Sequence, residues 1–93
     1  MKDQKHQIYL KEEKMLVNEA IELIKEQEKL HDQYELAKLL KVSQGTISNY
    51  YKGNTYPNLK VAGYIYGKYN LRCEPFTEEA LQKEWDFQKK HGL

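Results

Sequence analysis

The sequence has little cysteine, proline or glycine: one Cys, two Pro and five Gly among 93 residues. A single cysteine, Cys73, excludes a disulfide within the chain and is typical of proteins kept in a reducing compartment. No apolar run approaches the ~20 residues of a membrane-spanning helix, and the first residues, MKDQKHQ, lack the apolar centre of a secretory signal. No Gly- or Ser-rich linker divides the chain. We therefore expect a single cytoplasmic domain over residues 1–93, without a membrane partner.

Side chains arranged for catalysis or metal binding are also missing from the sequence. The three histidines, His6, His31 and His91, stand far apart and, together with Cys73, show no ligand spacing. No nucleophile–base pair and no Gly-rich phosphate loop can be recognised. The sequence therefore predicts a protein that is not an enzyme and that carries no metal or other cofactor.

Acidic residues are absent from the middle of the chain. The net charge is only +1, but residues 36–73 contain no Asp or Glu. The bases of this acid-free block are Lys38, Lys41, Lys52, Lys60, Lys68 and Arg72. Both flanking segments, 1–35 and 74–93, are net negative. A surface that faces phosphate groups favours such a block, because each acid removed strengthens the attraction to phosphate, although chance in a polar chain is the simpler alternative.

Hydrophobic periodicity predicts an all-α fold, a compact bundle of about five helices. The first helix is expected over residues 8–29, with a stripe formed by Leu16, Ala20, Leu23 and Ile24. The inner face of the fourth helix is expected at Leu59, Ala62, Ile65 and Tyr69, with Gly63 and Gly67 allowing a neighbouring helix to approach. The fifth helix, over residues 77–91, has an apolar side at Ala80, Leu81, Trp85 and Phe87. The expected N-caps are Asp32 (paired with Glu35 as a capping box), Ser43, Asn58 and Thr77.

Residues 33–52, QYELAKLLKVSQGTISNYYK, contain two short helical patterns joined by a tight turn. Leu36 and Leu40 lie on one face of the first helix, Ile47 and Tyr50 on one face of the second, and Val42 fills the turn. The outward side chains of the second helix are Gln44, Gly45, Thr46, Ser48, Asn49 and Lys52. A helix with a polar face of small side chains fits the major groove of DNA.

This stretch resembles the helix-turn-helix of the lambda-repressor-like family, which comprises Cro/repressor and XRE-type regulators. The matching elements are LAKLL, VSQGTISNY and the trailing KGNTYPN, and the resemblance extends over roughly residues 15–70. Two residues depart from the family pattern. Lys41 replaces a Gly that adopts a left-handed conformation, at a cost of ~1 kcal/mol, and Tyr51 replaces a Glu.

The resemblance implies a sequence-specific transcriptional regulator of double-stranded DNA, a small phage-like repressor that binds a near-palindromic operator as a homodimer. The residues expected to contact bases are Gln44, Gly45, Thr46, Ser48 and Asn49. Those expected to contact phosphates are Gln33, Ser43, Lys52, Asn54, Thr55, Tyr56 and Lys60. For Tyr56 the alternative is packing on Pro57. The terminal helix is the expected dimerisation element, with Leu81 and Trp85 at its centre, unless Trp85 packs back on its own domain.

Two other functions remain open at this point. A DNA-binding antitoxin would repress its own operon and neutralise a toxin through the terminal helix, and an antirepressor is another possible protein partner. A protein-interaction module would keep the fold without reading DNA. The acid-free block argues against the last of these.

Overall fold

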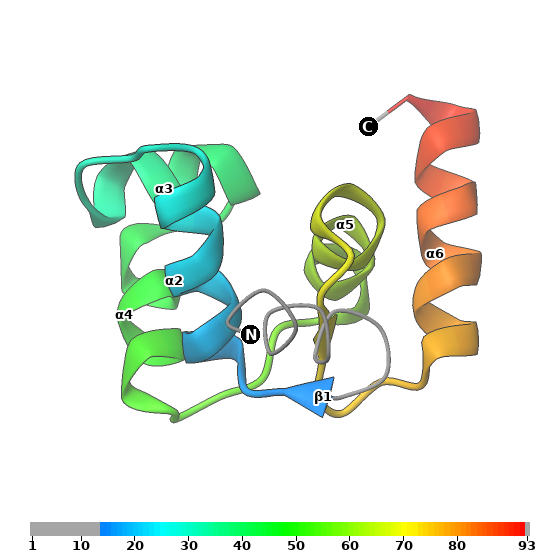
Figure 1. The fold of residues 1–93 in the computed structure, drawn as a ribbon, viewed down its shortest axis with the longest axis horizontal. Helices are drawn as coiled ribbons and strands as arrows, with labels where there is room; N and C mark the ends of the chain where they lie inside the picture. The colour runs from blue at the N-terminus through cyan, green and yellow to red at the C-terminus, as the bar shows by residue number, and fades with distance from the viewer. Residues whose placement is uncertain (1–13, 93) are drawn as a thin grey trace, which may run out of the picture. The chain divides into compact units, whose positions relative to one another are not determined.

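The structure, a computed structural model, describes residues 14–92 and contains five helices, which confirms the all-α prediction (Figure 1). The helices are α2 (Val17–Gln27), α3 (Gln33–Leu40), α4 (Gln44–Lys52), α5 (Leu59–Tyr69) and α6 (Glu78–His91). Two short strands, β1 (Lys14–Met15) and β2 (Arg72–Cys73), pair in parallel, with Met15 opposite Cys73. None of the helices between residues 14 and 92 is both long and apolar enough to cross a membrane.

The chain divides into two compact units, which are described separately. The three-helix unit, Leu16–Tyr56, contains α2, α3 and α4. The C-terminal unit contains α5, α6 and the strand pair. In the three-helix unit the core is apolar, and it is formed by Val17, Ala20, Ile21, Ile24, Leu36, Ala37, Leu40, Ile47 and Tyr50. The core includes the predicted inner faces of both α3 and α4.

The turn between α3 and α4 has the predicted left-handed residue. Lys41 has φ 60° and ψ 45°, and the N–H of Val42 donates to the Ala37 carbonyl at 3.0 Å. Lys tolerates this conformation less well than Gly, so the turn carries the expected strain of ~1 kcal/mol. Val42 is half-buried next to this turn, in agreement with its predicted role.

All four predicted N-caps are confirmed. The Asp32 carboxylate accepts from Glu35 N–H at 3.0 Å, and Asn58 accepts from Val61 N–H at 2.9 Å. The hydroxyls of Ser43 and Thr77 cap α4 and α6 in the same way. The capping box differs in one detail, because Glu35 accepts from His31 N–H, one residue before the expected partner. The start of each of these helices is therefore fixed by its own sequence.

The first helix is shorter than predicted. It begins at Val17 and ends at Gln27, whereas Lys14 and Met15 form a strand, and the remaining part of the predicted range, residues 8–13, lies outside the described residues. Leu16, expected on the apolar stripe, instead occupies the N-cap position and is 49% exposed. The parallel pairing with β2, through residues distant in sequence, replaces the helix here.

In the C-terminal unit α6 packs against α5 at two glycines, as predicted. A Cβ at Gly67 would overlap the Trp85 ring, and one at Gly63 would collide with Glu84. Gln88 is buried on the same contact, and its amide donates to the Lys60 carbonyl at 2.9 Å. The buried apolar residues of this unit are Met15, Val61, Ala62, Ile65, Tyr66, Tyr69, Leu71, Cys73 and Leu81.

Two predicted core positions in this unit are wrong. Leu59 is the first residue of α5 and is 36% exposed, while Val61 takes the inward position. Phe87 is 57% exposed and lies against the His91 ring, at 4.3 Å between ring centroids. The buried face of α6 is centred on Leu81 and Gln88, so Phe87 falls to the side of that face.

Candidate nucleic-acid interface

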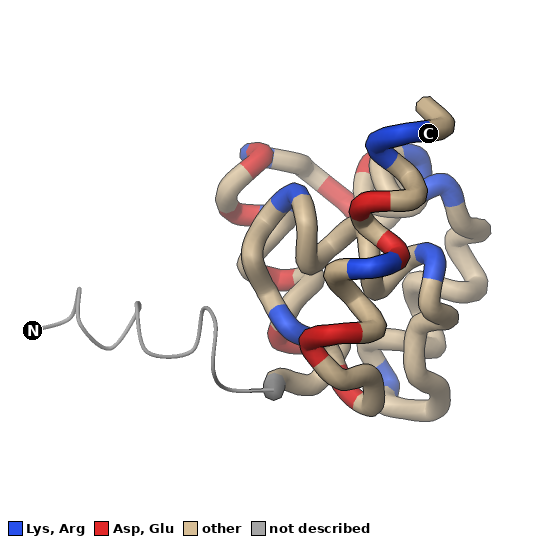
Figure 2. Tube along the Cα trace, turned by 90° about the vertical axis from the view of Figure 1, so that its right-hand side faces the viewer, with Lys and Arg blue, Asp and Glu red and all other residues tan. Residues whose placement is uncertain are grey.

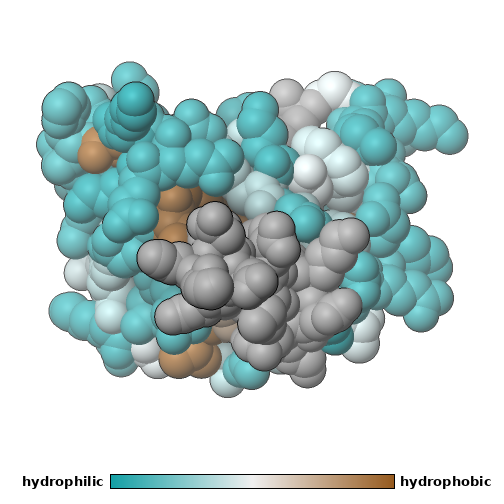
Figure 3. Space-filling view, viewed as in Figure 1, coloured by the Kyte–Doolittle hydropathy of each residue, from teal (hydrophilic) through white to brown (hydrophobic). Residues whose placement is uncertain are grey.

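Helix α4 presents the polar face that its sequence predicts. Ile47 and Tyr50 are buried in the three-helix unit, which turns the opposite side of the helix outward. Gln44, Gly45, Asn49 and Lys52 are exposed, and Thr46 and Ser48 are half-buried. In the visible face of this unit, hydrophilic side chains predominate and apolar patches are small (Figure 3). The structure therefore brings all five predicted base-contacting residues together in the first two turns of one helix.

The hydroxyls at the start of α4 are already paired with each other. Ser43 Oγ accepts from Thr46 N–H at 3.0 Å and lies 2.9 Å from Thr46 Oγ1. Only one hydroxyl hydrogen is used in that pair, so one of the two hydroxyls keeps a hydrogen for an external acceptor.

Gly45 has no structural requirement for glycine within the described residues. A Cβ at this position would meet only Ser43 Oγ, at an ordinary 3.8 Å, and its φ is not in the left-handed region. A glycine in a helix nevertheless costs about 1 kcal/mol relative to alanine. Gly63 and Gly67, in contrast, are each required by a neighbouring side chain. No contact among the described residues therefore explains the glycine at position 45.

The loop after α4 exposes its polar side chains, and among them the Thr55 hydroxyl donates to the Tyr56 carbonyl at 3.3 Å. Gly53, at φ 75°, ends the helix by donating to the Tyr50 carbonyl at 3.1 Å, and Asn54 N–H donates to the Asn49 carbonyl at 3.0 Å. Asn54, Thr55 and Tyr56 are all exposed. With 57% of its surface accessible, Tyr56 keeps most of its ring in solvent.

Six of the seven predicted phosphate-contacting residues belong to the three-helix unit. Gln33 is exposed at the first turn of α3, and Ser43, Lys52 and the loop residues belong to α4 and its ends. Lys60 is the exception, since it lies on α5 in the C-terminal unit.

Two features of this surface were missed by the sequence reasoning. Tyr34 is exposed on α3, and the Lys38 ammonium lies 5.5 Å above its ring centroid. The signal was their i, i+4 spacing, which places them one turn apart on a helix. A cavity of about 220 Å³ also lies in this unit, between the start of α2 and the loop after α4. It is lined by Leu16, Val17 and Asn18 from the start of α2 and by Gly53, Asn54, Thr55 and Tyr56.

The charge of the three-helix unit is less favourable to DNA than the acid-free block suggested. The unit holds five Lys and six acidic residues, the latter on α2, on the residue after it, and around the start of α3. One of these acids, Glu22 on α2, lies next to Tyr51 on α4. Burial of the Tyr51 hydroxyl, and to a smaller extent the neighbouring Glu22 carboxylate, raises the pKa of Tyr51 to about 12. No acid lies on α4 or its loop, so the local surface of the polar face is neutral to weakly positive.

The predicted dimerisation residues are used inside the C-terminal unit. Leu81 is completely buried, and Trp85 covers Gly67 with its ring, 6.2 Å from the Tyr64 ring centroid. Trp85 therefore packs on α5 of its own domain, as in the alternative, and is half-buried. A second copy of the chain cannot reach Leu81 while α6 is folded on α5.

Comparison with family models, curated proteins and solved structures finds no match to this chain. Among the described residues no three His, Cys, Asp or Glu side chains gather as metal ligands would. The candidate interface therefore rests on the geometry of α3, α4 and the following loop.

Proposed function

We propose that this protein is a sequence-specific, double-stranded DNA-binding transcriptional regulator, a small repressor that acts in the cytoplasm by covering a promoter. The observation that carries the proposal is the outward face of α4, a row of small polar side chains that contains a glycine without an internal structural role. A surface that must lie against base edges favours small polar groups and close backbone approach.

The proposed contacts follow from the side-chain chemistry. The Gln44 amide is suited to the N6 and N7 atoms of adenine, and the Thr46 methyl is suited to the methyl group of thymine. Lys52, Asn54 and Tyr56 donate to phosphate oxygens and fix the register of α4 on the duplex. The Gln33 side chain, exposed at the first turn of α3, adds a second phosphate contact.

A protein-binding function is the second candidate, and the charge of the three-helix unit favours it. With six acids against five Lys, this unit lacks the strong positive field of most DNA-binding domains. An antitoxin that binds both its operator and a toxin would combine the two functions. A protein-interaction module that does not read DNA is the remaining possibility.

A selection of bound duplexes from a random DNA pool tests the proposal, with wild type and Gln44→Ala run side by side. We expect wild type to enrich a motif and Gln44→Ala to lose preference at one base position of it. On the selected site Gln44→Ala should cost ~1–3 kcal/mol, and on random DNA far less. The matched control, Gln27→Ala, changes the same amide at the last residue of α2, outside the interface.

Two outcomes would contradict the proposal. If wild type enriches no motif, the polar face of α4 does not read sequence, and a search for a protein ligand would follow. If Gln44→Ala and wild type enrich the same motif with the same preferences, Gln44 does not contact a base. Circular dichroism of both variants ensures that a loss of binding is not a loss of fold.

A further inference from the structure

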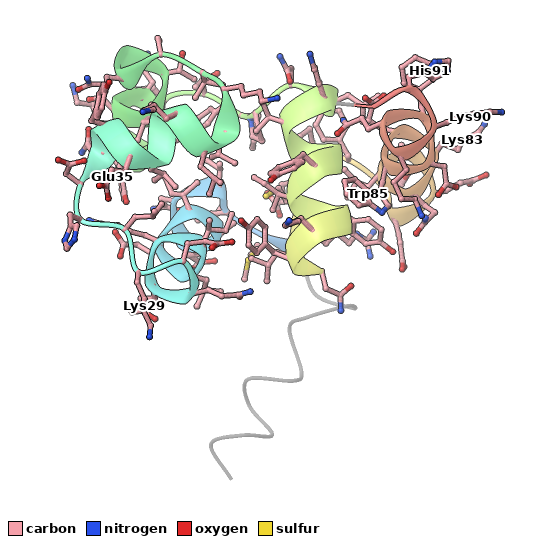
Figure 4. The ribbon with its side chains drawn as sticks, turned by 90° about the horizontal axis from the view of Figure 1, so that it is seen from above. Lys29, Glu35, Lys83, Trp85, Lys90 and His91 are labelled. Carbon is pink, nitrogen blue, oxygen red and sulfur yellow. The ribbon has the colours of Figure 1, made fainter. Side chains whose placement is uncertain are left out.

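The outer side of α6 carries charges of alternating sign at a helical spacing. Glu79, Lys83, Asp86 and Lys90 are all exposed and are separated by four, three and four residues. This spacing aligns them on one stripe of the helix, as at the contact positions of a coiled coil. Figure 2 shows acids and bases alternating along α6, and in Figure 4 Lys83 and Lys90 point away from α5 whereas Trp85 lies toward it.

The order of these charges is self-complementary in only one orientation. When a second α6 lies antiparallel, about a twofold axis between Glu84 and Trp85, Glu79 faces Lys90 of the second copy. In the same arrangement Lys83 faces Asp86 of the second copy, and the two reciprocal pairs follow by symmetry. A parallel arrangement would place each charge opposite the same charge. The stripe therefore matches an antiparallel copy of itself and opposes a parallel one.

Three charges of the stripe, those of Glu79, Lys83 and Lys90, have no ion-pair partner among the described residues, whereas Asp86 also accepts a hydrogen bond from the Gln82 amide at 3.0 Å. Among the described residues one ion pair is found, Asp86 with Lys89 at 3.8 Å, and Lys89 lies outside the stripe. None of the possible pairs within the stripe is closed, although Glu79 and Lys83, or Asp86 and Lys90, are one turn apart. Phe87 lies at the edge of the stripe with 57% of its surface exposed, and it offers the contact an apolar component.

We propose that this stripe is the interface between two copies of the chain, which associate through antiparallel α6 helices. The stripe would be the dimer interface of the proposed DNA-binding repressor, and the biological role of this dimer rests on that proposed function. The stripe replaces Leu81 and Trp85, which are occupied within the C-terminal unit. The occupant is a second copy because the complementary charges are those of the stripe itself.

The area available to this contact makes the dimer weak in free solution. A helix of 14 residues is ~21 Å long, so one helix pair buries a few hundred Å², below the ~800 Å² per partner of a stable interface. Two copies on adjacent half-sites are held at an effective concentration that reaches the millimolar range, where a weak contact is sufficient. The dimer then forms mainly on DNA, and its cooperativity falls with salt.

Charge reversal in trans gives the decisive test. Lys83→Glu places Glu opposite Asp86 of the second copy, and Asp86→Lys places Lys opposite Lys83. Each variant alone therefore repels itself, but an equimolar mixture of the two forms a heterodimer with every pair attractive. We would measure self-association of the full chain at low salt by sedimentation equilibrium, without DNA. Lys68→Glu on α5, which reverses one charge outside the stripe, is the control.

We expect each single reversal to weaken association at least tenfold, and the mixture to recover it to within threefold of wild type. Ion pairs within a single α6 would also explain the alternating charges, but mixing the two variants cannot restore ion pairs within either chain. Single reversals without effect, or a mixture that stays as weak as its components, would overturn the proposal. So would a wild type that remains monomeric at 1 mM. Because no DNA is present, these outcomes are independent of whether α4 reads DNA.

Discussion

Two exposed glycines, one on α4 and one at its end, differ in whether the structure requires a glycine there. Gly53 has φ 75°, and a Cβ there would meet no atom within 4 Å, so its requirement is conformational. Gly45 lies in regular helix with space for a Cβ, so neither conformation nor packing requires it. The two glycines are therefore both exposed but differ in their structural requirement, and substitution of each by alanine should distinguish them.

Gly45→Ala should stabilise the protein and weaken its DNA binding. Removing a helical glycine lowers the entropy of the unfolded chain and adds about 0.4–1 kcal/mol to the free energy of unfolding. The added methyl lies on the face proposed to approach the bases, so operator affinity should fall about tenfold, which corresponds to about 1.4 kcal/mol. Urea unfolding followed by circular dichroism and titration of a labelled operator provide the two measurements.

Gly53→Ala is the matched control for this prediction. It adds the same methyl group but at a positive φ, so the free energy of unfolding should fall by about 1 kcal/mol. If Gly45→Ala left operator affinity unchanged, the small size of Gly45 would not serve DNA, and the observation that carries the proposed function would be lost.

At the scale of elements, short-range chemistry could be predicted and long-range pairing could not. The N-caps at Asp32, Ser43, Asn58 and Thr77 follow from hydrogen bonds within four residues, and the structure has all of them. The start of α2 could not be predicted, because the strand at Lys14–Met15 depends on Arg72–Cys73, far along the chain. Helical periodicity carries no information about such a partner.

The same strand pair contains a titratable probe of the C-terminal unit. Cys73 is fully buried, and burial raises the pKa of its thiol from 9.0 to about 12. An acid whose pKa is higher in the folded state stabilises the fold below the unfolded pKa, and that stabilisation is lost as pH rises through the folded pKa. The window for this loss is therefore pH 9 to 12.

We expect the stability of the C-terminal unit to fall by up to ~1.4 kcal/mol per pH unit above pH 9 because of Cys73. Urea unfolding followed by the fluorescence of Trp85, the only Trp of the chain, reports on this unit. Cys73→Ala should remove that part of the slope between pH 9 and 10, whatever its effect on absolute stability. A slope identical in the two proteins would show that the thiol ionises equally in both states.

For the whole molecule, helical periodicity located the polar face of α4, but the acid-free block did not locate a positive surface. The face could be predicted because Ile47 and Tyr50 must turn inward, which fixes the direction of Gln44 and Asn49. The acid-free block did not predict a positive surface, because its basic residues are distributed over two units. Lys60, Lys68 and Arg72 belong to the C-terminal unit, and the other three belong to the three-helix unit. The exposed stripe of α6 was likewise overlooked, since its charges alternate and give no net signal.

A near-neutral molecule that binds DNA should depend only moderately on salt. Two predicted phosphate contacts in each protomer are Lys, at positions 52 and 60, so a dimer releases roughly four counterions. The plot of log affinity against log salt should then have a slope of about −4, and Lys52→Ala should reduce its magnitude by about 2 per dimer. The relative preference among sequences should stay the same, because phosphate contacts position the protein without reading bases.

Lys29→Ala separates a specific contact from a change in net charge. Lys29 is exposed after α2, outside the predicted phosphate set, and its removal changes the charge as much as that of Lys52. If the two variants flatten the slope equally, the field of the whole protein drives binding and Lys52 makes no individual contact. If only Lys52→Ala does, the loop after α4 holds the phosphate backbone, and the orientation of α4 on the duplex is fixed by that contact.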